Sequence, residues 1–414
     1  MNREQLLQGA SYPAFKEGLR RQCLKLHSIG ARTLIFHEGS RLRLMASSTA
    51  EFAGQQGPAG ELLALFRVGD WVGVELDVQG RIKNLRLLAP HLKEAPEPRV
   101  SPQTLREWNL FLKSVRQFFE KRDFLEVGTP TLVICPGTEP HLDVFKTKFK
   151  MGRREQDYFL PTSPELHLKK LVAAGYGSIF EMRPCFRNGE VTDHHQPEFW
   201  MLEWYRPGHD LASLRKDCLD LIQHVQKSLG RALTKKSSVT TMAALFEEHT
   251  GFELTPSTTA AELEALAQKL GVRIAPNSDF DDCFFQIFLE KVEPALESSS
   301  PVFVGDYPPS QAALARLTEE GWGDRFELYW KGLELANAYN ELNDPRLQRE
   351  RSADDLRKKA ALGRETVALD EDFYLALESG MPPTAGIALG LERLFLALTN
   401  RKSLNEVRLF PVRT

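Results

Sequence analysis

The chain has 414 residues, of which 42% are hydrophobic and 26% charged, and its formal net charge is −3. This composition is typical of a globular protein with more than one domain, and the slightly acidic balance argues against a general nucleic-acid coat protein. Its five cysteines form no Cys-x-x-Cys pair, so neither a disulfide framework nor a structural zinc site is expected. Because no apolar run has the length of a signal or membrane-spanning segment, we expect a cytoplasmic protein without a membrane association.

Residues 1–90 are predicted to form a small β-rich domain. A helical pattern over residues 4–27 is followed by short runs of β-forming residues, separated by glycines, at 33–37, 42–45, 71–78 and 82–88. Such runs favour a small antiparallel barrel or meander. Prolines 90, 96, 98 and 102 then lie among charged residues, which predicts a linker over residues 91–102.

Residues 103–414 are predicted to form a larger α+β domain. Apolar residues from Leu105 to Phe119 recur at three- and four-residue spacing, which predicts a helix with one apolar face, and Ser101 supplies its cap. Residues 231–300 show no evident catalytic pattern and are interpreted as an accessory region. Strands are predicted at 303–304, 326–330 and 333–339, and a helix at 390–398. Since strands and helices do not alternate regularly, we expect a mostly antiparallel sheet.

Carboxylates around a predicted hairpin indicate a cation site. A Lys-Gly pair between two β-rich runs predicts a two-residue turn, and on that register Glu327 faces Ala336. Glu327 and Glu334 then lie diagonally on one face, close enough to share a divalent ion. Asn337 and Glu341 have the opposite parity to Glu334, so a β-bulge is needed to bring all three into one cleft. A solvated polar strand face is the alternative interpretation.

Two arginines are candidates for binding phosphate. Arg187 precedes a short polar loop that leads to a Glu-x-Tyr pair, Glu203 and Tyr205. Arg393 lies in the first turn of a predicted helix after a glycine-flanked strand, where backbone N–H groups and the helix dipole favour anions. A guanidinium group binds phosphate in a bidentate manner. The glycines by themselves are a weak signal, and their usual explanation is close helix–strand packing.

Together these segments resemble the catalytic domain of class II aminoacyl-tRNA synthetases, over roughly residues 101–414. Residues 124–130 are similar to motif 1, residues 186–205 to motif 2 and residues 386–395 to motif 3. The sequences at 162–165 and 332–337 resemble the lysine branch, which contains lysyl-tRNA synthetases and their paralogue, elongation factor P lysyltransferase. Residues 195–207 and 309–315 are more similar to the paralogue.

The resemblance implies ATP-dependent activation of lysine or β-lysine to an aminoacyl-adenylate, followed by transfer to a lysine side chain of elongation factor P. It also implies Mg²⁺ as a cofactor and a homodimer formed through the motif 1 helix. One alternative is a lysyl-tRNA synthetase, because residues 68–75 and 84–90 resemble the last strands of an anticodon-binding OB-fold. We expect instead a reduced OB-like domain that does not read tRNA. The second alternative is a non-catalytic paralogue that senses lysine or binds a partner.

The resemblance also assigns roles to individual residues. Arg187 and Arg393 are the expected catalytic cations, with Glu165 at the α-ammonium, Asn337 at the carboxylate, and Glu203, Tyr205 and Glu341 at the distal ammonium. The expected amino-acid site comprises Ser163, Pro164, Glu165, Glu203, Tyr205, Asn337 and Glu341. The expected ATP site comprises Arg187, Asn188, Gly189, Glu190, His195, Gln196, Glu334, Leu335, Gly390 and Arg393, and the expected Mg²⁺ ligands are Glu327 and Glu334.

A few residues depart from the family pattern or allow another interpretation. Gly189, His194, Gln196 and Glu392 differ from the residues usual at these positions. We interpret His194 and His195 as parts of a loop that contacts ATP rather than as metal ligands, because no third ligand lies at metal-site spacing. We expect Cys185 to be a small buried residue rather than a reactive thiol.

Overall fold

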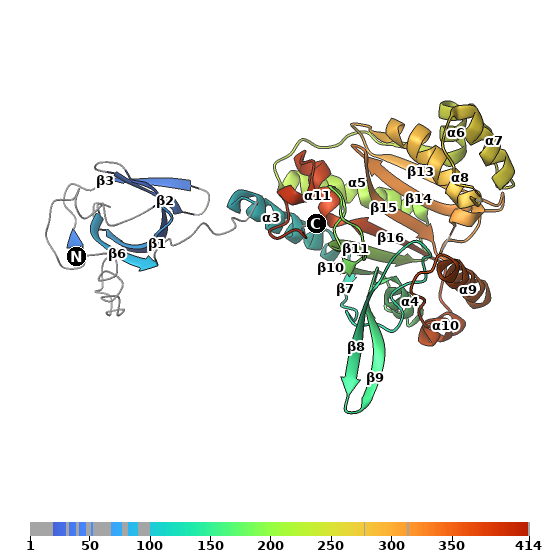
Figure 1. Ribbon diagram of the computed structural model, residues 1–414, viewed down its shortest axis with the longest axis horizontal. Coiled ribbons are helices and arrows are strands. Elements are labelled where there is room, and N and C mark those ends of the chain that lie inside the picture. The colour runs from blue at the N-terminus through green and yellow to red at the C-terminus, as the bar shows by residue number, and fades with distance from the viewer. Residues whose placement is uncertain are drawn as a thin grey trace. The chain divides into compact units, whose positions relative to one another are not determined.

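The computed structural model describes residues 20–29, 33–38, 41–46, 51–52, 68–76, 82–89 and 100–412, except 277 and 313. The chain divides into two compact units, Met1–Leu105 and Arg106–Thr414 (Figure 1). The predicted limits of the linker and of the accessory region remain predictions.

The first unit contains a six-stranded sheet. Its strands are β1 (Arg20–Ile29), β2 (Thr33–Glu38), β3 (Arg41–Ala46), β4 (Glu51–Phe52), β5 (Trp71–Leu76) and β6 (Ile82–Ala89), in the order β3-β2-β1-β5-β6-β4. All four predicted β runs are strands over their described residues, and residues 77 and 78 of the third run lie outside the described part of the chain. The predicted helix is wrong over residues 20–27, which belong to β1, whereas residues 4–19 lie outside the described part of the chain. The sequence Leu-Lys-Leu-His at 24–27 alternates with period two, and pairing with β2 and β5 outweighs the helical spacing.

The second unit is built on an eight-stranded sheet, which confirms the predicted α+β fold. From one edge to the other the strands are β12 (Ser238–Thr241), β13 (Val302–Tyr307), β14 (Gly323–Trp330), β15 (Leu333–Asn340), β16 (Thr384–Gly390), β11 (Glu198–Pro207), β10 (Ile179–Phe186) and β7 (Leu125–Glu126). The strands from β13 to β10 pair antiparallel, and each edge strand pairs parallel with its neighbour.

One face of this sheet is covered by helices α3 (Pro102–Glu120), α5 (Leu211–Ser228) and α11 (Leu391–Thr399) (Figure 1). The Phe119 ring stacks on Phe180 with centroids 4.7 Å apart and lies 5.2 Å from Trp204. Burial of each such side chain stabilises the fold by about 1.5–3 kcal/mol. The Ser101 hydroxyl accepts a hydrogen bond from the Thr104 N–H at 3.1 Å, as expected for the helix cap.

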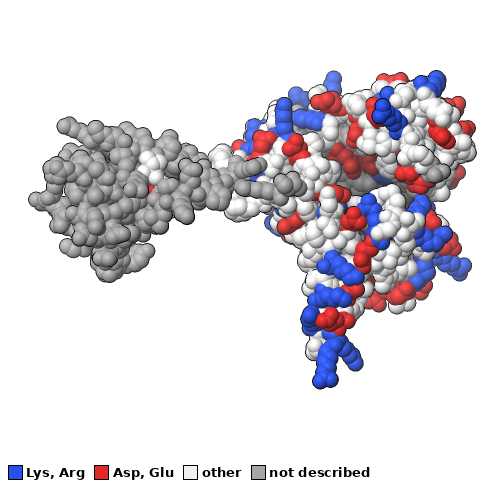
Figure 2. Space-filling model, viewed as in Figure 1, with Lys and Arg blue, Asp and Glu red and all other residues white. Residues whose placement is uncertain are grey.

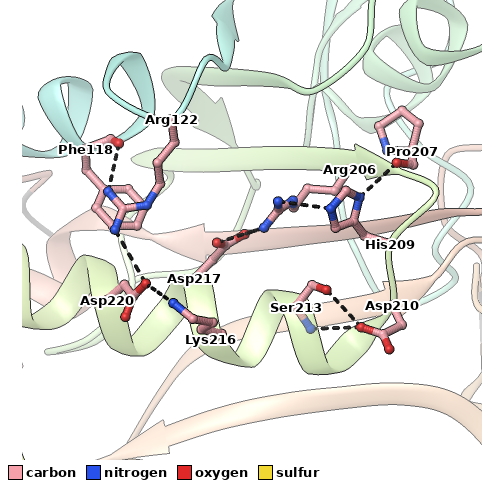
Figure 3. A network of polar contacts seen from close by, with 10 residues as sticks. All are labelled: Phe118, Arg122, Arg206, Pro207, His209, Asp210, Ser213, Lys216, Asp217 and Asp220. Carbon is pink, nitrogen blue, oxygen red and sulfur yellow. Dashed lines mark hydrogen bonds and ion pairs between the residues drawn. The ribbon is translucent and has the colours of Figure 1, made fainter.

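A charged network fixes α5 to the end of β11 (Figure 3). Arg206 Nη1 donates to both carboxylate oxygens of Asp217 at 3.0 Å. Arg122 donates to Asp220 at 3.4 Å, and Asp210 caps the N-terminus of α5. Because β11 carries Glu203 and Tyr205, this network helps to fix the strand that supplies two of the predicted site residues.

Strand alternation directs polar residues to the opposite face of the sheet. In β11, Leu202 and Trp204 belong to the apolar core beneath the helices, whereas Tyr205 packs with residues of α4 (Glu165–Ala173) and α10 (Glu371–Glu378). Helix α9 (Pro345–Ala361) contacts α10 on this side. The sheet therefore has an apolar face and a second face that is free to carry a polar site.

The remaining elements lie around this sheet. Helices α6 (Met242–Thr250), α7 (Ala260–Leu270) and α8 (Phe280–Ile287), with the short helices η1 (Phe288–Val292) and η2 (Glu293–Leu296), have their own apolar cluster, which extends onto β13. Strands β8 (Phe145–Met151) and β9 (Arg154–Leu160) form a projecting hairpin rich in lysine and arginine (Figure 2). Short helices η3 (Pro309–Gln311) and η4 (Leu404–Glu406) complete the unit. In the part of the chain that the structure describes, no helix is both long and apolar enough to cross a bilayer.

Candidate active site

A cavity of about 350 Å³ brings together most of the residues predicted from the sequence. It lies over β11, β15 and β16 and is closed at one side by the loop between β10 and β11. The predicted residues that line it are Ser163, Glu165, Arg187, Glu190, His195, Gln196, Glu203, Tyr205, Glu334, Leu335, Asn337, Glu341, Gly390 and Arg393. The predicted residues that do not line it are Pro164, Asn188, Gly189 and Glu327. Arg187 and Arg393 therefore share one cavity.

A β-bulge in the β14–β15 hairpin aligns the polar residues of β15. The register shifts between Leu328 and Tyr329, so that Glu327 pairs with Asn337 rather than with Ala336. The predicted register is wrong by this one residue, because a bulge adds an unpaired residue that turn chemistry alone does not reveal. The same bulge places Glu334 in the wall of the cavity that Asn337 and Glu341 also line, as the sequence argument required.

Arg393 is held rigidly at one end of the cavity. Its Nη1 donates to the backbone carbonyl of Glu334 at 2.8 Å and lies 3.6 Å from the Glu334 carboxylate. Its Nη2 contacts His195 Nε2, and since a guanidinium group can only donate, this nitrogen must accept. His195 Nδ1 then carries the proton and donates to Thr192 Oγ1 at 2.9 Å. Burial, together with the charges of Arg393 and Arg187, lowers the pKa of His195 to about 4, so the ring is neutral.

Arg187 is held much more loosely. Its guanidinium lies 5.0 Å from the Phe199 ring and, among the described residues, forms no hydrogen bond or ion pair with another side chain. The Nε atom is buried without a partner. A cation in this state is unusual inside a protein unless a ligand supplies the counter-charge. Arg187 is therefore arranged to bind an anion that enters the cavity.

The other end of the cavity is an acidic recess. The Ser163 and Tyr205 hydroxyls donate to the two carboxylate oxygens of Glu203, which is 1% exposed. Glu165 and Glu341 lie on either side of a buried lysine, Lys169, whose ammonium group contacts both. The recess thus contains more carboxylates than ammonium groups, as a site for a positively charged ligand requires.

The carboxylates of the recess are difficult to ionise while it is empty. Burial raises the pKa of Glu203 well above its usual range, and the charge of Glu165 raises it further. Burial also raises the pKa of Glu341 to about 8, against the opposing effect of Lys169. An ammonium group that enters the recess therefore replaces protons held there by the carboxyl groups.

The predicted metal ligands are only partly brought together. Glu334 lies in the cavity wall, and burial together with the charge of Glu327 raises its pKa. The Glu327 carboxylate, however, accepts hydrogen bonds from Arg325 and from the hydroxyls of Tyr307 and Tyr329. Across the described residues, no group of three or more His, Cys, Asp or Glu side chains is placed to hold a metal ion.

Other residues singled out in the sequence have structural partners. Gln196 is 3% exposed and accepts a hydrogen bond from the Val412 N–H at 2.9 Å, and His194 Nε2 lies 2.9 Å from the Lys402 carbonyl. Both Glu392 oxygens accept from the Trp200 N–H, at 2.8 and 3.0 Å. Cys185 is fully buried, and burial raises the pKa of its thiol, in agreement with the expected inert role.

Lys169 and Glu139 also belong to the site and are not predicted from the sequence. Glu165 and Lys169 are four residues apart on one helix, a spacing that usually indicates an exposed ion pair, so their burial was not evident. Glu139 lines the cavity from a segment without regular structure, and burial raises its pKa. Hydrophobic periodicity gives no signal for a residue in such a loop.

Comparison with known proteins agrees with this architecture. Residues 91–414 match the family described as "tRNA synthetases class II (D, K and N)". Proteins named elongation factor P--(R)-beta-lysine ligase are similar over most of the chain. That of Hamiltonella defensa is 39% identical over 73% of this chain and 92% of its own length. Those of Erwinia tasmaniensis and Pseudoalteromonas translucida are 38% and 39% identical, each over 76% of this chain and 97% of the relative.

These matches confirm the resemblance predicted from the three motifs. The family match begins at residue 91 and so spans the whole sheet with all the cavity residues, while residues 1–90 lie outside it. The relatives are matched over almost their full length, so the likeness does not depend on a single motif. The chain belongs to the class II tRNA synthetases of the D, K and N group.

Proposed function

We propose that this protein uses ATP to activate lysine or β-lysine as an aminoacyl-adenylate and then transfers the acyl group to a lysine side chain of elongation factor P. One observation carries the proposal: the same cavity holds an unpartnered guanidinium, Arg187, and a recess with three carboxylates, Glu165, Glu203 and Glu341. The cavity can therefore bind ATP, a polyanion, next to an amino acid that carries two ammonium groups. The name shared by the relatives supports elongation factor P as the acceptor.

The proposed activation step relies on positioning and electrostatics. The amino-acid carboxylate attacks the α-phosphorus of ATP, and pyrophosphate leaves. Arg187 binds the α-phosphate and the attacking carboxylate, while Arg393, oriented by Glu334 and His195, binds the departing phosphates. Donors that are already oriented stabilise the charge that develops in the transition state, which is commonly the largest part of catalysis. No nucleophile of the protein is required.

The proposed amino-acid site distinguishes the two ends of the substrate. Glu203, with Tyr205 and Ser163 fixing its orientation, and Glu341 face the distal ammonium, and Glu165 faces the other ammonium. Asn337 presents its side chain to the substrate carboxylate. Each ammonium group then loses its hydration water and gains a carboxylate partner, and a charged group can be buried only when it is paired in this way.

Magnesium fits this site only in part. Glu334 supplies one carboxylate at the phosphate end, and the remaining oxygens of an octahedral shell would come from phosphates and water. Glu327 would need to release Tyr307 or Tyr329 before it could contribute. When bound, the ion would neutralise phosphate charge and orient the leaving group. We propose Glu334 as the principal protein ligand.

Two further proposals concern assembly and the N-terminal unit. Leu110, Leu125, Leu132 and Ile134 are each more than 40% exposed in and around the motif 1 segment, and apolar patches of this kind mark interfaces. We propose a homodimer that covers them, to be checked by light scattering. We also propose that the N-terminal unit is an OB-like domain that does not read tRNA, and that the enzyme acts in the cytoplasm.

ATP–pyrophosphate exchange and an acceptor assay test the proposed function. Purified full-length protein is expected to exchange label between ATP and pyrophosphate only when lysine or β-lysine is present. Labelled amino acid should then appear on elongation factor P, but not on a variant whose acceptor lysine is replaced. Efficient charging of tRNA-Lys without transfer to the factor would refute the proposed acceptor, and an absence of exchange with either amino acid would favour a non-catalytic lysine sensor.

A further inference from the structure

Lys169 is the one described ammonium group that contacts the recess carboxylates. It lies one turn after Glu165 on α4 and is 0% exposed. Its Nζ is 2.6 Å from Glu341 Oε2, and it donates a hydrogen bond to Glu165 Oε1. Glu341 Oε1, on the other side of the same carboxylate, is buried and has no hydrogen-bond partner. This ion triad differs from a surface pair, because the Lys169 and Glu341 side chains are 0% and 1% exposed and that of Glu165 is 14% exposed.

The charges in and around the recess can be counted. Glu165, Glu203 and Glu341 provide three negative charges when ionised, and Lys169 provides one positive charge. Outside the recess, Glu181 lies 3.7 Å from Arg183, and burial raises the pKa of Glu139, which favours its uncharged form. Two negative charges therefore remain, and lysine and β-lysine each carry two ammonium groups. A low-dielectric site favours the ligand that neutralises it.

We propose that Lys169 is a positioning residue that sets the charge of the recess: it neutralises one of three carboxylates and holds Glu165 and Glu341 in place, so that a substrate with two ammonium groups completes the balance. The inference rests on the proposed function, since it concerns the amino acid that the enzyme activates. Lys169 then supplies a permanent ammonium group in the recess, in addition to the two that the bound substrate brings. Selectivity for a diamino acid then depends on a residue that need not touch the substrate.

The protonation states are consistent with this role. Burial disfavours the charged form of Lys169, but the charges of Glu165 and Glu341 outweigh burial and raise its pKa, so the ammonium group persists at neutral pH. Tyr205 remains a neutral donor, because burial and the charge of Glu203 raise its pKa well above its usual range. The carboxyl groups are thus the members of the recess that change protonation when substrate binds.

Three variants distinguish the effect of the net charge of the recess from the effect of losing the individual contacts of Lys169 and Glu341. Glu341→Gln leaves Lys169 facing two carboxylates, a net charge of −1 that does not match a dication. Lys169→Met alone leaves the carboxylates unopposed and is expected to be less stable, because breaking a buried ion pair strands its partner. The double variant Lys169→Met/Glu341→Gln restores a net charge of −2 and strands one carboxylate, Glu165, instead of two. Lys216→Met is a matched control, since Lys216 forms a pair of the same spacing with Asp220 but is 74% exposed.

Amino-acid-dependent ATP–pyrophosphate exchange is measured with lysine and with norleucine, which lacks the distal ammonium (or, if β-lysine is preferred, with β-lysine and 3-aminohexanoate). Glu341→Gln should raise the KM for the diamino acid about 10-fold or more and reduce discrimination against the monoamino analogue, while the KM for ATP stays unchanged. The double variant should recover at least part of both losses. A purely structural Lys169 would change thermal stability without changing this selectivity.

The inference is overturned if the double variant is no better than Glu341→Gln, or if a folded Lys169→Met keeps wild-type KM and selectivity. If Lys169→Met does not fold, the comparison of Glu341→Gln with the double variant still decides. Exchange by the wild-type protein tests the proposed function separately, so a failure of either idea can be recognised.

Discussion

Replacement of Arg187 should remove catalysis while leaving the fold intact. Among the described residues its guanidinium forms no hydrogen bond or ion pair; it lies 5.0 Å from the Phe199 ring, and its charge acts on Glu139 and Glu334 only at longer range. The variant Arg187→Ala therefore loses one cation–π contact of about 0.5–1 kcal/mol, and it relieves the burial of an unpaired nitrogen. We expect a change in Tm of no more than a few degrees.

The effect on activity should be much larger. Removal of one oriented donor from a site that stabilises developing negative charge typically lowers kcat about 10²- to 10³-fold, or roughly 2.7–4 kcal/mol. Arg393→Ala is the matched comparison, because Arg393 contacts the Glu334 carbonyl and His195. It should lose activity to a similar degree and also lose stability, since hydrogen bonds from a charged donor contribute about 1.5–3 kcal/mol each.

The two variants are compared by ATP–pyrophosphate exchange and by thermal unfolding. If Arg187→Ala kept exchange within about twofold of wild type, Arg187 would not be a phosphate ligand. If its Tm fell as far as that of Arg393→Ala, the guanidinium would have a structural partner in solution, and the argument from its missing contacts would be wrong.

Three further outcomes follow from groups described above. The KM for the amino acid should fall as pH rises from 6 to 8, because burial raises the pKa of Glu341 to about 8 and only its ionised form pairs with ammonium; a flat profile would contradict this pairing. Burial also raises the pKa of Glu392 to about 7, so its stabilising contribution is complete at low pH and is lost as pH rises through 7. Glu392→Gln keeps an acceptor for the Trp200 N–H and should therefore gain Tm relative to wild type at pH 8 but not at pH 5. In Gly386→Ala the new Cβ would lie 2.1 Å from a Glu341 oxygen and 2.5 Å from a Tyr205 ring carbon, so amino-acid KM should rise at least about 10-fold while the KM for ATP does not; an unchanged amino-acid KM would mean that the recess tolerates this displacement.

Much of the fold could be predicted because its local signals agree with its packing. The helix at Pro102–Glu120 has a serine cap and a continuous apolar face, and the structure buries that face. Strand β1 is predicted in part as helix because its short alternation competes with helical spacing, and only its pairing with β2 and β5 decides between them. Pairing of this kind is non-local and leaves little trace in a single sequence.

Site residues could be predicted where the charge of the side chain indicates what it binds. Arg187, Glu203 and Glu334 all line the cavity, whereas Glu327 accepts hydrogen bonds from the Tyr307 and Tyr329 hydroxyls, a contact that no local pattern predicts. The contact of Lys169 with Glu341 joins residues 172 positions apart in the chain, and its burial arises from the packing of α4 against the sheet. Spacing along a helix could not have indicated it.

The placement of Glu165 and Lys169 on successive turns of α4 has a consequence for motion. When α4 undergoes a thermal displacement, both charges travel together as a dipole, and the potential of a dipole decays faster with distance than that of a lone charge. Glu203, anchored on the neighbouring strand, therefore experiences a steadier field than if the two charges came from separate segments. Small movements of α4 therefore change the electrostatic potential at Glu203 only slightly.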